Sequence, residues 1–365
     1  MHPFKLAHAS GDSCADVLES CLAQLTEHNG SPNLGFLYVT DECAADLPRM
    51  LDTVREQTNV QHWVGSVGMG ICCTRHEYYD QPAAALMLGE FAPDSFRIVH
   101  DAASEVHQAH GAEGLQVAVV HGDPRNQDLP GLVRRLPSAL GNGYLVGGLT
   151  SSRSHYYQIA DEATEGRLSG VIFDAQQSIV AGLSQGCSPI GPVHELTQCS
   201  GNIAARIDDR PALDVFFDDI GEVLARDLQR VAGYIFVGLP VRGTDTGDYL
   251  VRNLIGIDTE QRLLAVGDHL TSGAPIMFCR RDGHSALEDL ERMLNSVKRR
   301  AASPIRGALY FSCLGRGRSL FGDESQELRL VAETLGDVPL VGFYANGEIC
   351  GDRLYGYTGV LTLFL

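Results

Sequence analysis

A glycine-rich loop near the C-terminus carries the residue types best suited to holding a small charged ligand. The run Cys313–Arg318 follows a predicted strand and precedes a predicted helix. Gly315 and Gly317 allow backbone N–H groups to converge, and Arg316 adds a planar, two-pronged donor for a carboxylate or phosphate. The run lacks both the Gly-Lys-Ser/Thr of a nucleotide-binding P-loop and the G-x-G-x-x-G spacing of a dinucleotide site. The alternative is a tight turn whose arginine makes a structural ion pair.

A second polar loop follows the next predicted strand, residues 340–343. If this strand runs parallel to the strand over 307–312, both loops emerge at one edge of a sheet, where open α/β folds bind ligands. Arg316 would then bind the carboxylate of an amino acid and Glu348 its ammonium group. A plain Asn-Gly turn with a solvated glutamate is the alternative. The predicted ligand-binding residues are Cys313, Gly315, Arg316, Gly317, Asn346, Gly347, Glu348 and Tyr355, the last as a wall, and the turn Gly65–Gly70 is the next candidate.

The sequence offers no convincing catalytic set. The run Gly182–Gly186 matches the G-x-S-x-G of a nucleophile elbow, but that motif requires a helix directly after the serine, and Pro189 opposes one. His121 and Asp123 resemble a catalytic pair, yet the sequence places no nucleophile beside them. We therefore predict no catalytic residues and expect a binding protein more than an enzyme, although the sequence leaves catalysis open.

Metal and haem sites are not expected either. His100, His107 and His110 share one helical face, where a solvated surface is a simpler explanation than a ligand set. The acidic turn Asp245–Asp248 does not have the spacing of an EF-hand. No C-x-x-C-H motif for haem attachment occurs in the sequence. We therefore predict no metal, no cofactor and a colourless purified protein, with haem as the alternative that the sequence leaves open.

Three segments of the chain repeat one order of elements. Residues 34–88 read as a strand, an amphipathic helix, a strand ending in glycines and a further strand. The same order recurs over 115–173 and 307–365, and the Asp-Leu-Pro that begins at Asp46 is repeated at Asp128. We therefore predict that the three segments adopt one strand–helix–strand–strand arrangement.

The chain between the second and third copies follows a different pattern. A helix is predicted over 211–231, and three short strands follow it before another amphipathic helix. Strands that arrive without intervening helices indicate mixed sheets. The predicted fold class is α/β, with mixed β-sheets flanked by helices and repeated strand–helix–strand–strand units. Two domains are expected, over 1–190 and 191–365, with the proline-containing segment 185–201 as their connection.

Composition restricts the classes of partner. The 365 residues are enough for two domains with cores of their own. A net charge of −18 opposes binding to nucleic acid, whose backbone is itself negative. No apolar run approaches the ~20 residues of a membrane helix, so a membrane is not an expected partner. Ten scattered cysteines without an export signal indicate a reducing compartment, and we expect a cytoplasmic location.

Several runs resemble the FIST family, named for F-box and intracellular signal transduction proteins. The first half is similar to the family's N-terminal domain in Trp63–Gly70 and Leu145–Gly148. The second half resembles its C-terminal domain in Phe311–Gly317, Leu340–Glu348 and Leu354–Gly359. The C-terminal runs are the specific part, and the resemblance covers nearly the whole chain.

The resemblance implies a FIST N-like domain over 1–190 and a FIST C-like domain over 191–365. It further implies an intracellular sensory protein in signal transduction that binds a small ligand, an amino acid or a similar small polar metabolite, and contacts a signalling protein partner. Some family members bind haem as gas sensors, and eukaryotic relatives carry an F-box for which this chain has no room. The alternatives are an enzyme acting on a small polar metabolite and an interaction adaptor without a ligand.

Overall fold

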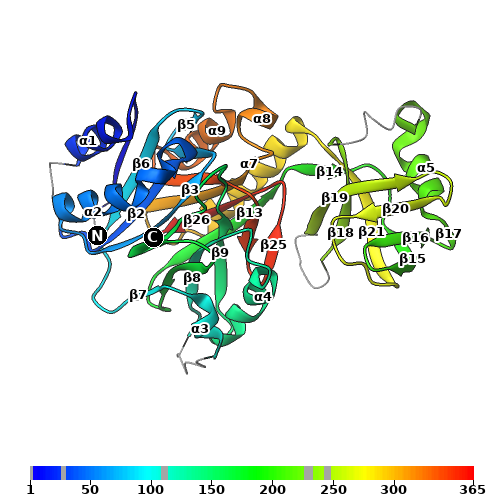
Figure 1. Cartoon of the computed structure of the whole chain (residues 1–365), viewed down its shortest axis with the longest axis horizontal. Helices are drawn as coiled ribbons and strands as arrows, with labels where there is room; N and C mark the ends of the chain where they lie inside the picture. Colours follow the sequence, from blue (N-terminus) through cyan, green and yellow to red (C-terminus); the bar gives the residue numbers. More distant parts are fainter. Residues whose placement is uncertain (1–2, 26–29, 108–113, 226–232, 242–247) are drawn as a thin grey trace. The chain divides into compact units, whose positions relative to one another are not determined.

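The computed structural model of the chain describes residues 3–25, 30–107, 114–225, 233–241 and 248–365 (Figure 1). The chain divides into two compact units. Unit 1 comprises residues 1–184 and 287–365, and unit 2 comprises residues 185–286. These units differ in extent from the two domains expected over 1–190 and 191–365, because the C-terminal segment packs with the first half of the chain.

Unit 1 begins with the first copy of the repeat. Strand β2 (Leu34–Thr40) runs parallel to β3 (His62–Gly68), with helix α2 (Leu47–Thr58) between them in the chain, and β6 (Ala83–Gly89) pairs antiparallel with β2. Every residue of β2 and β6 is buried, as expected for apolar strands covered on both faces. Helix α2 has a proline in its first turn and ends at Asn59, whose φ of 59° is left-handed.

The second copy repeats this arrangement. Strand β8 (Val117–Gly122) runs parallel to β9 (Tyr144–Leu149), helix α4 (Leu129–Ala139) connects them, and β12 (Leu168–Phe173) pairs antiparallel with β8. Leucine and valine side chains on one face of α4 are buried against the sheet.

The third copy has the same order and the same strand directions. Strand β22 (Gly307–Cys313) runs parallel to β23 (Leu340–Ala345), and β26 (Thr358–Phe364) pairs antiparallel with β22. The short helix α8 (Arg318–Phe321) and helix α9 (Gln326–Leu335) lie between the parallel strands in the chain. The predicted strand–helix–strand–strand arrangement is therefore confirmed in all three segments.

The repeat is longer than the sequence indicates. In each copy a preceding strand pairs with the last strand, and a helix follows that preceding strand in the chain. The preceding strands are β1 (Lys5–Ser10), β7 (Phe96–Val99) and β13 (Ile179–Gln185), and the helices are α1 (Cys14–Gln24), α3 (Ala102–His107) and α7 (Gly283–Arg300). In the third copy, unit 2 is inserted in the chain between β13 and α7.

Each copy also gives a hairpin to another copy. The β4–β5 hairpin of the first copy pairs with β23, the β10–β11 hairpin of the second with β3, and the β24–β25 hairpin of the third with β9. The result is three six-stranded mixed sheets of one common order, β1-β6-β2-β3-β10-β11 in the first case. The hairpins comprise β4 (Gly70–Cys73), β5 (His76–Tyr79), β10 (Gln158–Ala160), β11 (Glu162–Thr164), β24 (Glu348–Cys350) and β25 (Arg353–Tyr355).

Three glycines identify equivalent positions in the copies. A Cβ atom on Gly65, Gly147 or Gly342 would lie 1.8 Å from the carbonyl oxygen of Leu37, Val120 or Tyr310 respectively. The residues that follow those three carbonyls meet in the interior, where the Tyr38 hydroxyl lies 3.0 Å from Nε2 of His121 and the Phe311 ring contacts both. The three sheets are thus arranged around an approximate threefold axis.

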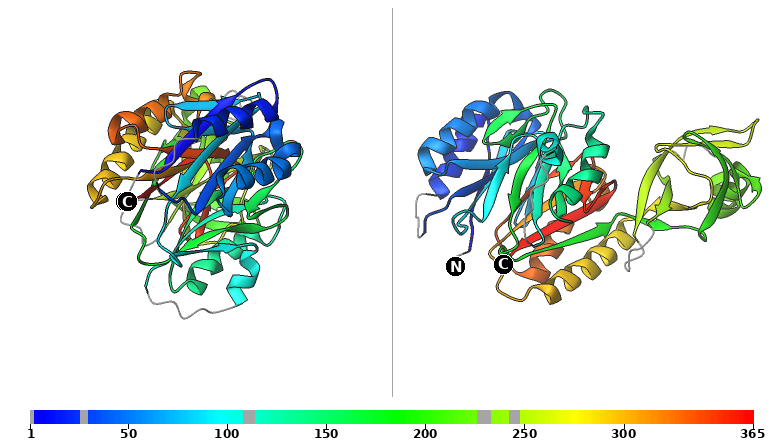
Figure 2. Two further views of the ribbon diagram at one scale, coloured as in Figure 1. Left: turned by 90° about the vertical axis from the view of Figure 1, so that its left-hand side faces the viewer. Right: turned by 90° about the horizontal axis from the view of Figure 1, so that it is seen from below.

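Unit 2 is a small closed barrel, seen as a green and yellow ring in the right-hand view of Figure 2. Six strands pair in a circle, because β18 contacts both β19 and β21. Helix α5 (Ala212–Ala225) packs Phe216 into the barrel core. The strands are β21 (Ala274–Arg281), β15 (His194–Ser200), β16 (Ile203–Ile207), β20 (Leu263–Val266), β19 (Tyr249–Asp258) and β18 (Ile235–Pro240).

Two expectations about this part of the chain are corrected. The segment 185–201 is no simple connection, since it forms β14 (Cys187–Pro189) and β15 of unit 2; its prolines lie at the end of β14 and between the two strands. Of the helix predicted over 211–231, α5 covers 212–225, and the rest lies outside the described residues. Among the described helices, none has the length and apolar character needed to cross a membrane.

Candidate functional site

The two polar loops predicted from the sequence lie side by side. Strands β22 and β23 are parallel, with Cys313 opposite Ala345 in register. Directly after them, the Leu314 N–H donates to the Ala345 carbonyl at 3.0 Å. The two loops therefore emerge at one edge of a sheet, in the third copy of the repeat.

Arg316 makes a buried ion pair rather than an open clamp. Its side chain is fully buried, and Nη2 and Nε lie 2.6 and 2.7 Å from Oε1 of Glu327, the second residue of α9. The Glu327 carboxylate also accepts hydrogen bonds from Tyr310 and Ser312. The remaining guanidinium nitrogen, Nη1, is buried and has no hydrogen-bond partner within the described part of the chain.

Glu348 is the first residue of β24 and is fully buried. Its Oε2 accepts hydrogen bonds from the backbone N–H and the hydroxyl of Thr358, at 3.1 and 2.8 Å. Burial raises the pKa of Glu348 to about 8, although those bonds, the charge of Arg316 and the nearby Cys313 thiol oppose the rise. Its Oε1 is buried without a hydrogen-bond partner among the described residues. At neutral pH the carboxyl group is therefore mostly neutral.

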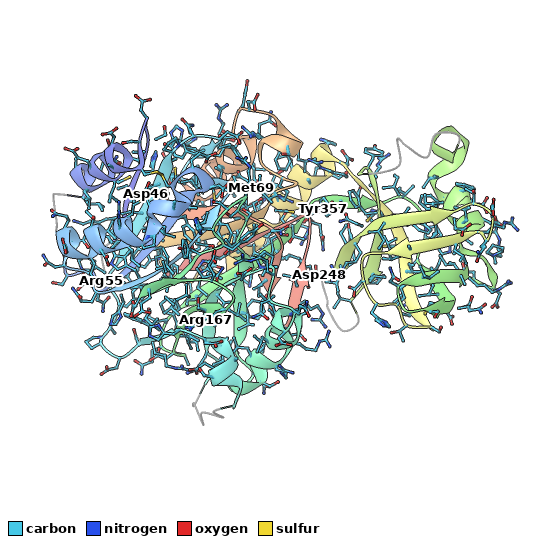
Figure 3. All side chains as sticks on the ribbon, in the orientation of Figure 1. Asp46, Arg55, Met69, Arg167, Asp248 and Tyr357 are labelled. Atoms are coloured by element: carbon cyan, nitrogen blue, oxygen red, sulfur yellow. A yellow bond between two sulfur atoms is a disulfide. The ribbon has the colours of Figure 1, made fainter. Side chains whose placement is uncertain are left out.

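Tyr357 covers the glycine-rich loop and was missed by sequence reasoning. Its φ of 61° is left-handed, which is rare for an aromatic residue and is found mainly where the surroundings require it (Tyr357 is labelled in Figure 3). A Cβ atom on Gly315 would lie 2.9 Å from the Tyr357 ring, so a glycine is needed there. The sequence signal for Tyr357 is the Leu354–Gly359 run, in which Tyr355 is the residue predicted to bind the ligand.

The partly exposed Cys313 lies under this cover. Its Sγ accepts a hydrogen bond from the Gly315 N–H at 3.4 Å. Burial, followed by the nearby Glu348 carboxyl, raises the pKa of the thiol well above its usual range. Cys313 is therefore a neutral thiol and a poor nucleophile at neutral pH.

The remaining predicted residues have different surroundings. Tyr355 pairs with Glu348 in the β24–β25 hairpin and is buried, whereas Asn346 is exposed. Gly347 and Gly317 have left-handed φ values of 132° and 50°. A Cβ atom on Gly317 would lie 2.1 Å from the Tyr79 hydroxyl oxygen, which explains the glycine by packing. Helix α8 has only four residues, so the expected electrostatic contribution of a helix N-terminus is small.

Equivalent positions in the other copies carry different chemistry. Glu348, in β24, pairs with Gly148 of β9. Gln158 in β10 and Ile71 in β4 occupy the equivalent positions in the hairpins of the second and first copies. Gln158 is also buried, and its Oε1 has no hydrogen-bond partner among the described residues, but its Nε2 donates to the Thr150 hydroxyl at 2.8 Å. The buried acid is thus particular to the third copy.

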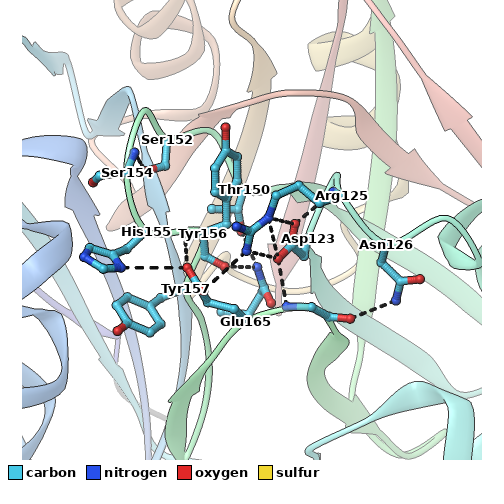
Figure 4. A network of polar contacts seen from close by, with 12 residues as sticks. Asp123, Arg125, Asn126, Thr150, Ser152, Ser154, His155, Tyr156, Tyr157 and Glu165 are labelled. Carbon is cyan, nitrogen blue, oxygen red and sulfur yellow. Dashed lines mark hydrogen bonds and ion pairs between the residues drawn. The ribbon is translucent and has the colours of Figure 1, made fainter.

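A polar network occupies the corresponding edge of the second copy (Figure 4). Asp123, which is equivalent to Cys313, accepts hydrogen bonds from Arg125 Nη2 at 2.6 Å and from the Gly166 N–H at 2.8 Å. Burial alone would raise the pKa of Asp123, but these bonds outweigh it and lower the pKa. The guanidinium of Arg125 also lies over the Tyr156 ring and contacts Glu165. The positive charge of Arg125 is therefore already balanced by Asp123 and Glu165, and these contacts hold the loop after β8 in place.

The other residues that the sequence offered as catalytic or metal-binding candidates do not come together as such a site in the described residues. His121 is buried at the threefold axis, where burial lowers its pKa to about 3, and Asp123 bonds to Arg125 instead. Ser184 is a buried residue of strand β13, with no helix directly after it. Asp245 and His110 lie outside the described residues, and no group of three His, Cys, Asp or Glu side chains suited to a metal occurs in the described ranges.

Comparison with known proteins identifies two family domains whose shared boundary, near residue 211, lies inside unit 2. A family model of the FIST N domain matches residues 33–210, and one of the FIST C domain matches residues 212–351. An uncharacterized protein of Mycobacterium tuberculosis strain H37Rv is 28% identical over 382 residues, covering 97% of this chain and 98% of the relative. An uncharacterized protein of Mycobacterium bovis is 27% identical over 347 residues, covering 88% and 87%.

Proposed function

Because the chain belongs to the FIST family, over residues 33–210 and 212–351, we propose that it is a sensory protein that binds a small polar metabolite in the third repeat. FIST domains are proposed sensory and signalling domains. One observation carries the placement of the ligand: Arg316 Nη1 and Glu348 Oε1 are both buried without partners in the described residues. Buried donors and acceptors are nearly always hydrogen-bonded in proteins, so this pair favours a bound polar group.

The two side chains select the ligand by charge. The Glu327 carboxylate occupies Nε and Nη2 of Arg316, which leaves Nη1 to donate to a ligand carboxylate. Glu348 in its neutral form donates from Oε1 to a carbonyl or hydroxyl oxygen. An amino acid would instead place its ammonium group at Oε1 and displace the proton of Glu348, whose pKa is about 8. We therefore propose an amino acid or a related small carboxylic acid as the ligand.

A ligand reaches Arg316 and Glu348 past Cys313, Gly315 and Tyr357, which cover the proposed site and are partly exposed. Since Nη1 and Oε1 are themselves buried, ligand entry requires this cover to move. Such a movement gives a ligand-dependent change at the protein surface, which is the output we propose for a signalling protein partner. We also propose a cytoplasmic location, because eight of the cysteines are free thiols.

Small molecules released from the native protein, identified by mass spectrometry, test this function first. Calorimetry with the identified compound then compares Glu348→Gln with the wild type, and Asp352→Asn, a partly exposed residue of the same hairpin, is the matched control. If the compound is an amino acid, loss of the charge-assisted contact to its ammonium group, about 1.5–3 kcal/mol, should weaken binding at least tenfold in Glu348→Gln only. Equal affinity in all three proteins would place the ligand elsewhere.

Calorimetry also separates the two ligand types. An amino acid should release a proton from Glu348 at neutral pH, so the observed enthalpy should depend on the ionisation enthalpy of the buffer. A 2-oxo or 2-hydroxy acid should leave the proton in place and give one enthalpy in all buffers. Proton release that persists in Glu348→Gln would exclude this residue as its source.

A further inference from the structure

Two cysteines of unit 1 are joined in the structure. Cys14 and Cys43 form a disulfide with a Cα–Cα distance of 5.6 Å, while the remaining eight cysteines are thiols. In a reducing compartment, disulfides are usually transient and serve catalysis or redox sensing. We propose that Cys14–Cys43 is a reversible thiol–disulfide site that exchanges with glutathione and controls the position of helix α1.

The surroundings of the two sulfur atoms differ. Cys14 is the first residue of α1, directly after Ser13, whose hydroxyl oxygen accepts the Asp16 N–H at 3.2 Å. A thiolate is stabilised at the N-terminus of a helix, which favours exchange at this position. Cys14 is 8% exposed whereas Cys43 is fully buried. Cys14 is therefore the sulfur that an external thiol reaches, and Cys43 is the resolving partner.

The exchange balances with glutathione as the only co-reactant. In oxidation, the Cys14 thiolate attacks one sulfur of glutathione disulfide and releases one glutathione thiolate, which takes up a proton. The Cys43 thiolate then attacks the Cys14 sulfur of the mixed disulfide and displaces the second glutathione. Two electrons pass from the cysteine pair to glutathione disulfide, and reduction by two glutathione thiols is the reverse.

The bond holds a segment of the first copy that contacts the second copy. Cys43 lies in the 3₁₀ helix η1 (Asp41–Asp46), directly after β2. Asp41 accepts hydrogen bonds from the Ser152 hydroxyl at 2.5 Å and from the Arg153 N–H at 3.1 Å. Arg153 also lies 3.5 Å from the Glu42 carboxylate. A change at Cys43 therefore acts on the contacts between two copies of the repeat.

Helix α1 has space to move once the bond opens. A surface groove of about 700 Å³ runs along the contact between α1 and α2 and is lined mainly by apolar side chains, including Leu18, Leu22 and Leu25. Val17 and Cys21 lie beside these leucines on the helix and pack into the core together with Leu18 and Leu25. Both helices are labelled in Figure 1 and lie beside the blue strands of the first copy. The disulfide fixes the first turn of α1, and reduction allows the helix to shift towards α2.

The test uses the full chain in glutathione buffers that range from fully reduced to fully oxidised. After an acid quench and alkylation, mass spectrometry of peptides gives the fraction of Cys14–Cys43 disulfide at each ratio. We expect this fraction to change from near zero to near one across the series, while the buried Cys21, on the same helix, stays a thiol throughout. A pair that remains a disulfide at the reducing end, or remains thiols at the oxidising end, would overturn the proposal.

Hydrogen exchange tests the consequence. Reduction of the wild type should accelerate exchange about tenfold in residues 14–24 and 41–46, which is the expected signature of a lost local constraint, and leave barrel strand β21 unchanged. Cys14→Ser should reproduce the reduced wild type. Equal exchange in the oxidised and reduced wild type would refute control of α1, even if the Cys14→Ser variant could not be obtained folded.

Discussion

Replacing Glu348 with glutamine should change how the free energy of unfolding depends on pH. The raised pKa of this buried carboxyl group sets the direction of the change. The pKa of Glu348 is about 8 in the folded protein against 4.5 for an ordinary glutamate. A group whose pKa is raised by folding contributes stability that is fully present below pH 4.5. That contribution is lost as the pH rises through 8, because the folded state must then bury a charge.

The magnitude follows from the two pKa values. One pH unit corresponds to about 1.36 kcal/mol, so the full change from 4.5 to about 8 amounts to about 5 kcal/mol. Glu348→Gln keeps the shape of the side chain and removes its titration. The variant should therefore match the wild type near pH 4.5 and exceed its free energy of unfolding by several kcal/mol at pH 9.

Urea denaturation at a series of pH values between 4.5 and 9 measures this difference directly. Other titrating groups are shared by both proteins and cancel in the comparison. Asp352→Asn, which removes a partly exposed carboxylate of the same hairpin, should follow the wild type at every pH within about 0.5 kcal/mol. A constant difference between Glu348→Gln and the wild type would mean that Glu348 titrates normally, and the neutral acid in the proposed site would have to be abandoned.

Three further outcomes are expected from the structure. Arg316→Met should lower the free energy of unfolding by about 3–5 kcal/mol in urea because it leaves Glu327 buried without its ion-pair partner, and the double variant with Glu327→Gln, which keeps an acceptor for Tyr310 and Ser312, should recover part of that loss. Gly147→Ala should prevent folding or lower the melting temperature strongly, since its Cβ would lie 1.8 Å from a carbonyl oxygen, whereas Gly131→Ala in helix α4 should be neutral or stabilising. The stability owed to neutral His121 should be present above pH 6.5 and lost as the pH falls towards 3, so His121→Asn should flatten the acid side of the stability profile measured by circular dichroism.

The repeat could be found in the sequence because each copy contains all of its own local signals. The fully buried β2 and the helix that begins after Asp46 depend on residues close in the chain, and so do their counterparts at Asp128. The parallel pairing of β22 and β23 followed from the same pattern, and it brought the two predicted loops together.

Other features depend on contacts that no local pattern contains. The hairpin strand β4 pairs with β23, more than 260 residues away, so its place could not be read from its own neighbours. Arg316 has the sequence context of a ligand clamp, but Glu327 lies one helix later and takes two of its nitrogens. Unit 2 interrupts the third copy between β13 and α7, which concealed the first strand of that copy.

The exchange of hairpins also explains why the proposed site is confined to one copy. At the shared hairpin position, Ile71 supplies packing, Gln158 donates to Thr150, and Glu348 brings a buried acid near Arg316. Each of these residues pairs with a strand of a different copy, so a ligand held by Glu348 contacts β24, which is paired with β9 of the second copy. If the proposed ligand moves β24 when it binds, the movement acts on two copies at once. A sensory protein needs such a connection between its ligand and a larger part of the molecule.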